Sequence, residues 1–181
     1  MSSEEMEASH LNHLLFVYGT LKQGEPNQDV IKTENKIDGK EQPQSQFIGK
    51  AETIEKYPLV IATKHNVPFL LNLPGTGYNV TGEIYEINDK MLEKLDIFEE
   101  CPEYYIRRKE CVRLLDTQKT AECWIYFLKG HHPNLIKLEM FNNYCSNGEH
   151  GLPYLESPGN ESCWNDVLET SAQLNPNGDS S

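Results

Sequence analysis

The chain contains little positive charge for its size, which narrows the kinds of partner that it can have. Its 181 residues include 16 Lys and Arg against 28 Asp and Glu, so the formal net charge is −12 at pH 7. Nucleic acids and anionic membrane surfaces attract proteins through basic surfaces. We therefore expect neither as a partner, and small molecules or cationic partners stay open.

Long hydrophobic runs are also missing. No apolar segment approaches the ~20 residues of a membrane-spanning helix, and residues 1–10 are polar and acidic, unlike a secretory signal. These absences predict a soluble, cytoplasmic protein. The hydrophobic share of 38% is enough for the core of one domain.

Closely spaced cysteine and histidine ligands are absent as well. The five cysteines contain no CxxC pair, and the histidines have no HxxxH or HExxH spacing. This pattern favours reduced thiols over a disulfide framework or a zinc site. The sequence also lacks GxGxxG, P-loop and GxSxG motifs. We therefore expect no metal and no cofactor.

Short apolar runs separated by turn residues predict a domain rich in β-strands. The first run ends at Gly19, which tolerates backbone angles that other residues resist, and Gly82 predicts a bulge or a close approach within its strand. The second and third runs suggest an antiparallel pair. We expect strands at 14–17, 47–54, 57–61, 67–73, 80–87, 104–115 and 122–128.

Polar segments and helices complete the expected organisation. Residues 27–32 and 135–141 predict short helices, and 33–46 predicts a polar surface excursion. Residues 1–12 predict a mobile leader and 157–181 a disordered tail, which leaves 13–156 as the domain.

One clear helix runs from Asn88, a suitable N-cap, to about Glu99. At 100° per residue, its apolar face comprises Met91, Leu92, Leu95 and Phe98. Glu99 falls on that face, whereas Glu100 faces solvent. A carboxylate there must be paired, hydrogen-bonded, exposed at the helix end or used, because burying it bare costs several kcal/mol. Pairing with Arg107 or Arg108 and exposure at a frayed end are the structural alternatives.

Two blocks resemble those of the γ-glutamylcyclotransferase-like family. Tyr18-Gly19-Thr20-Leu21 resembles the family's opening motif, and 95–102 followed by 104–108 resembles the helix-end block that carries its catalytic glutamate. By position, Glu99 is the match. Further blocks resemble the γ-glutamylaminecyclotransferase branch, and with the first two they cover most of 14–154: 55–61, 65–71, 73–75, 82–85 and 149–152.

The resemblance implies an α+β fold, a small mixed β-barrel with flanking short helices and a cavity at one end. It implies that a γ-glutamyl amine, such as ε-(γ-glutamyl)-lysine, cyclises to 5-oxoproline and releases the free amine. Glu99 would be the general acid and base. The substrate would be bound by Tyr18, Gly19, Thr20 and Leu21.

Several alternatives stay open at this point. Glu83 is the competing acid, although acidic residues on half-exposed strands are usually solvated. Tyr144 and Tyr154 either wall the cavity or simply pack. The substrate class is alternatively γ-glutamyl amino acids or glutathione, or the barrel is catalytically idle and binds a partner. A monomer is favoured.

Overall fold

The computed structural model describes residues 10–32, 34–37, 39–130 and 133–156. Residues 1–9 of the expected leader and the whole expected tail, 157–181, lie outside the described residues. The predicted bounds of the domain therefore stay a prediction.

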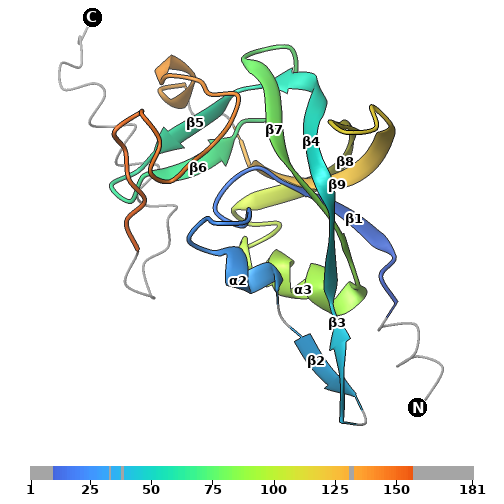
Figure 1. The fold of residues 1–181 in the computed structure, drawn as a ribbon. Helices are drawn as coiled ribbons and strands as arrows, with labels where there is room; N and C mark the ends of the chain where they lie inside the picture. Colours follow the sequence, from blue (N-terminus) through green and yellow to red (C-terminus); the bar gives the residue numbers. More distant parts are fainter. Residues whose placement is uncertain (1–9, 33, 38, 131–132, 157–181) are drawn as a thin grey trace, which may run out of the picture.

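Five strands close into a mixed barrel in the order β1-β7-β4-β8-β9 (Figure 1). A parallel bridge between Leu15 and Trp124 joins the first and last strands, whereas the other neighbours are antiparallel. The expected α+β fold with a small mixed barrel and short helices is confirmed. The strands are β1 (His13–Val17), β4 (Ser45–Tyr57), β7 (Tyr78–Ile87), β8 (Tyr105–Leu114) and β9 (Thr120–Leu128).

Two small sheets stand beside the barrel. Strands β2 (Glu34–Ile37) and β3 (Lys40–Pro43) form a hairpin that projects from the α2 and α3 end of the molecule (Figure 1), and β5 (Leu59–Ala62) pairs with β6 (Val67–Leu70). The segment expected as a polar surface excursion, 33–46, thus contains this hairpin and the start of β4, and the strand residues 40–43 are exposed. The expected pairing of the second and third strands is wrong, since β4 pairs with β7 and β8.

The C-terminal parts of strands β1 and β9 are buried on both faces, which positions these strand ends inside the protein. Cys123, Ile125 and Phe127 are fully buried, as the alternation predicts. Tyr126 and Leu128 are buried as well, in a second cluster that contains helix α3. The end of β9 therefore contributes to the barrel and to the packing of α3.

Helix α3 (Asp89–Phe98) begins where the sequence predicts, because the Asn88 side chain accepts a hydrogen bond from the Met91 N–H at 2.9 Å. Met91, Leu92 and Leu95 are buried. Phe98, the last residue of the predicted apolar face, is 42% exposed. Helix α2 is Gln28–Ile31, and the helix expected at 135–141 is only a 3₁₀ turn, η1 (Leu135–Lys137).

Gly82 marks a close approach rather than a bulge. A Cβ atom there would lie 2.3 Å from the Val17 carbonyl oxygen, whereas the register shifts between β4 and β7 occur elsewhere. Among the helices of the described residues, none is long and apolar enough to cross a membrane.

Candidate active site

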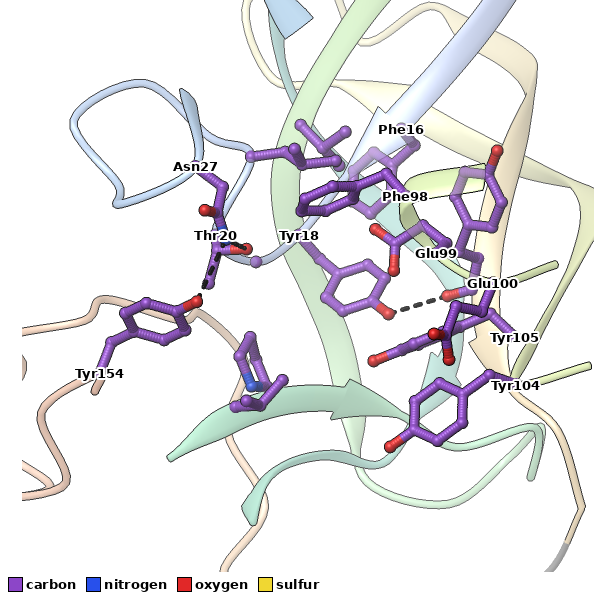
Figure 2. A pocket seen from close by; sticks show the side chains of 16 residues that line it. Phe16, Tyr18, Thr20, Asn27, Phe98, Glu99, Glu100, Tyr104, Tyr105 and Tyr154 are labelled. Atoms are coloured by element: carbon purple, nitrogen blue, oxygen red, sulfur yellow. Dashed lines mark hydrogen bonds between the residues drawn. The ribbon is translucent and has the colours of Figure 1, made fainter. Parts of the chain in front are cut away.

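A cavity of about 410 Å³ opens where β1 and α3 end, beside the start of β6 and the last part of β9. Tyr18, Gly19, Thr20, Leu21 and Glu99 all line it, so the fold brings every predicted site residue to one place (Figure 2). Side chains from both buried strands and from the C-terminal segment complete its wall.

The loop after β1 offers free hydrogen-bond donors to this cavity. Within the described part of the chain, the backbone N–H groups of Gly19, Thr20 and Leu21 donate to no acceptor. Gly19 is required here for space and not for unusual backbone angles, because its φ is not positive. A Cβ atom would lie 2.9 Å from Cγ of Pro68, so the sequence identified the correct glycine for the wrong reason.

Asn27 and Tyr126 hold this loop in place. The Asn27 N–H donates to the Thr20 carbonyl at 2.9 Å, and its side-chain amide donates to the Thr20 hydroxyl at 3.0 Å. The Tyr18 hydroxyl donates to the Tyr126 carbonyl at 2.8 Å. The loop is therefore tied to α2 on one side and to β9 on the other, which fixes the direction of its free N–H groups.

Glu99 is the C-cap residue that follows α3, and its side chain faces the cavity beside the Tyr18 ring (Figure 2). Its carboxyl makes no hydrogen bond or ion pair with any residue that the structure describes. Arg107 instead bonds to Asp96 at 2.7 Å, and Arg108 to Glu110 at 2.8 Å. The alternative in which an arginine neutralises Glu99 is thus wrong.

Burial controls the protonation of this carboxyl. Removal from water disfavours the charged form and raises the pKa of Glu99 to about 8. Burial, and then the charge of Glu99, also raise the pKa of Tyr18. Glu99 is partly exposed, and a pKa near 8 lies within about one unit of neutral pH, a range suited to proton transfer.

The turn after α3 directs Glu99 and adds a residue that the sequence analysis missed. The N–H of Glu100 bonds to the Ile97 carbonyl at 3.1 Å, and that of Cys101 to the Asp96 carbonyl at 2.8 Å, which is a Schellman motif. Glu100 is exposed, as the helix phase predicts, yet it also lines the cavity. Helix phase does not apply beyond the helix end, so the signal was the break at Pro102.

The other candidate residues separate clearly. Glu83 is not solvated as expected: it is 6% exposed and accepts hydrogen bonds from the Gln23 N–H and the Tyr85 hydroxyl, both at 3.0 Å. It lines a different cavity. Tyr154 lines the cavity with Glu99, whereas Tyr144 is buried in the core away from it.

The fold and the site are thus those of a small closed barrel with an end cavity, where Glu99 lies without a counter-charge near a loop of free N–H groups. The chain belongs to the family described as "Gamma-glutamyl cyclotransferase, AIG2-like", whose model matches residues 15–146. The resemblance read from the sequence blocks is thereby confirmed.

Individual relatives agree with this assignment. The chain is 45% identical over 140 residues to the gamma-glutamylaminecyclotransferase of Bos taurus, covering 77% of this chain and 80% of that protein. It is 43% identical over 141 residues to the troponin C-akin-1 protein of Drosophila melanogaster, covering 78% and 80%. The crystal structure of an AIG2-like protein from Mus musculus superposes with a TM-score of 0.72 at 39% identity, covering 82% of this chain and 99% of that one.

Proposed function

We propose that this protein is a γ-glutamylamine cyclotransferase that converts γ-glutamyl amines, such as ε-(γ-glutamyl)-lysine, to 5-oxoproline and the free amine. The names of its relatives support this activity. The observation that carries the proposal is that Glu99, with a pKa near 8, shares one cavity with the free N–H groups of the Tyr18 to Leu21 loop.

The reaction needs one proton carrier and no water. The α-amino nitrogen of the substrate attacks its own γ-carbonyl carbon and closes a five-membered ring, and the bond from that carbon to the amine nitrogen then breaks. Because the nucleophile is tethered to its target, the enzyme has only to hold a reactive conformer. The α-ammonium loses two protons as it becomes the lactam N–H, and the departing nitrogen gains two as it becomes an ammonium. Glu99 as carboxylate takes each proton from the former and passes it to the latter, so the atoms balance.

The loop after β1 supplies the hydrogen-bond donors for the negatively charged groups of the substrate. The cavity lining contains no Lys, Arg or His among the described residues. A substrate carboxylate, or the oxyanion that develops on the γ-carbonyl, is therefore bound by the N–H groups of Gly19, Thr20 and Leu21. Preorganised backbone donors of this kind stabilise developing negative charge.

The same lining favours amines over the alternative substrates. Glutathione and γ-glutamyl amino acids such as γ-glutamyl-alanine bring a further carboxylate with no second ammonium, whereas ε-(γ-glutamyl)-lysine brings both groups. The cavity contains Glu99 and Glu100 and no basic side chain among the described residues, so a carboxylate without an ammonium is disfavoured. An idle barrel would not need an uncompensated acid, because burying it lowers stability. We propose further that the enzyme is cytoplasmic and monomeric and needs no cofactor.

The test is 5-oxoproline release from ε-(γ-glutamyl)-lysine, γ-glutamyl-alanine and glutathione, before and after dialysis against a chelator. We expect the first to react fastest, with no loss after dialysis. The variant Glu99→Gln should lose about 10²-fold to 10⁴-fold in kcat, as expected for a general acid–base, while its circular dichroism spectrum and substrate affinity stay close to those of the wild type. Near-normal turnover by Glu99→Gln would reject the role of Glu99.

A further inference from the structure

We infer that Glu100 makes this site selective for γ-glutamyl amines whose amine half carries a second ammonium group. The inference rests on the proposed function and names the substrate class of the same cavity. It follows from the charge of the lining, from the side chains around Glu100 and from the backbone conformation of that residue.

The charged side chains that line the cavity are all acidic. Its sixteen lining residues include Glu99 and Glu100 and, in the part of the chain that the structure describes, no basic residue. In the proposed complex, the α-carboxylate of the glutamyl half accepts hydrogen bonds from the free N–H groups of the loop after β1. A second positive charge on the substrate can therefore pair with an acidic side chain of the cavity. A second negative charge has no basic side chain to pair with among the described lining residues.

Glu100 lies with two tyrosines on the side of the cavity opposite Asn27 and Tyr154 (Figure 2). The Tyr104 N–H donates to the Glu100 carbonyl at 2.8 Å, which closes the turn. The rings of Tyr104 and Tyr105 meet edge to face with centroids 5.1 Å apart, and both residues are buried. A carboxylate beside fixed aromatic rings is a suitable binding site for an alkylammonium group. The ammonium forms an ion pair with the carboxylate and is attracted to the faces of the rings.

The conformation of Glu100 is unusual for a glutamate. Its φ is +49°, in the left-handed region that the residue after a helix C-cap adopts in a Schellman motif, where glycine is strongly preferred. Its carboxylate makes no ion pair or hydrogen bond with the described residues. A residue that strains the backbone without an intramolecular partner is consistent with a role toward a ligand.

Four substrates with one spacer length isolate this charge. The γ-glutamyl derivative of cadaverine carries the distal ammonium alone, that of lysine carries an ammonium and a carboxylate, that of pentylamine carries neither, and that of 6-aminohexanoate carries the carboxylate alone. We expect kcat/KM for γ-glutamyl-cadaverine to exceed that for γ-glutamyl-pentylamine by about fivefold or more, which corresponds to the upper range of an exposed ion pair. The kcat/KM of the lysine derivative should be lower than that of the cadaverine derivative. The 6-aminohexanoate derivative should have the lowest kcat/KM of the four.

Two variants of Glu100 and one control complete the experiment. Glu100→Gln removes the charge and keeps the backbone strain, whereas Glu100→Gly removes the charge and relieves the strain. A loss of selectivity that both variants share is therefore due to the lost charge and not to a folding defect. The control is Glu103→Gln, which changes the same charge on an exposed residue of the same turn that does not line the cavity. The ratio of cadaverine to pentylamine should fall towards one in both Glu100 variants and stay at the wild-type value in the control.

The ratio retained in Glu100→Gln, or lowered equally in Glu103→Gln, would overturn the inference. Failure of the proposed function gives a different result, because no γ-glutamyl compound would then release 5-oxoproline. In that case calorimetric binding of the γ-glutamyl derivatives of cadaverine and pentylamine measures the same preference, and equal affinities would overturn the inference on their own.

Discussion

Glu99 links the stability of the fold to the chemistry of the site. Its pKa is about 8 in the folded protein against an ordinary value of 4.5, so the folded state holds this proton more tightly than the unfolded state. The resulting stabilisation is fully present below pH 4.5 and is lost as the pH rises through 8. Glu99→Gln cannot ionise and should escape this loss.

We therefore expect Glu99→Gln to raise the melting temperature relative to the wild type at pH 9 and to leave it nearly unchanged at pH 4.5. A difference of about 1 kcal/mol corresponds to roughly 2–4 °C for a chain of this size. Thermal melts of both proteins across this range measure it. Parallel curves at all pH values would contradict the shifted pKa.

Glu83 gives the matched test of which acid carries the proton. In the wild type, kcat/KM should rise with pH and then level off, because the free enzyme needs Glu99 as carboxylate. The midpoint of this rise should lie near pH 8. Glu83→Gln should keep that midpoint and lose about 1 kcal/mol of stability, since a buried acceptor of two hydrogen bonds is weakened. A moved midpoint, read from pH–rate profiles, would instead assign the titration to Glu83.

At the scale of elements, the sequence predicted well those strands and helices whose bounds depend on local signals. The apolar run of β1, the Asn88 cap and the Pro102 stop each act within a few residues, and they placed β1 and α3 closely. The pairing of β4 with β7 and β8 was missed because it depends on partners far along the chain. Glu99 was found by its phase together with the family resemblance, whereas Glu100 was missed because phase ends with the helix.

A second element-scale feature connects the first loop to the C-terminal segment of the domain. The buried Lys22 ammonium donates to Asn143 Oδ1 at 2.9 Å and to the Tyr144 carbonyl. The Ser146 N–H donates to Glu25 at 3.0 Å. Since this segment continues to Tyr154 on the cavity wall, these bonds position both sides of the site together.

Lys22→Met, which keeps most of the side chain but removes the donor, should loosen the C-terminal segment. We expect a loss of about 1.5–3 kcal/mol, the usual value of hydrogen bonds to a charged group, and a higher KM with a smaller change in kcat. Hydrogen exchange of residues 141–155 should become faster. Lys32→Met is the control, because Lys32 is exposed and donates to the Gln28 side chain on the surface; unchanged exchange in Lys22→Met would refute the connection.

At the scale of the whole molecule, barrel closure and net charge act together on the substrate. Joining β1 to β9 brings segments that are more than one hundred residues apart to one cavity. That cavity belongs to a protein of formal net charge −12. Such a charge attracts cations over distances longer than a contact, and salt screens this attraction.

The long-range part of the charge preference can be separated from the contact with Glu100 by ionic strength. The screening length falls from about 30 Å at 0.01 M salt to about 10 Å at 0.1 M. Over this range kcat/KM should fall for γ-glutamyl-cadaverine, stay level for the neutral pentylamine derivative and rise for that of 6-aminohexanoate. Glu100→Gln should keep most of the slope for cadaverine, because it removes one negative charge from a net charge of −12, even though its preference at high salt is lost. Initial rates along a salt series measure all four slopes, and equal slopes for the three substrates would show that the acidic surface has no part in their selection.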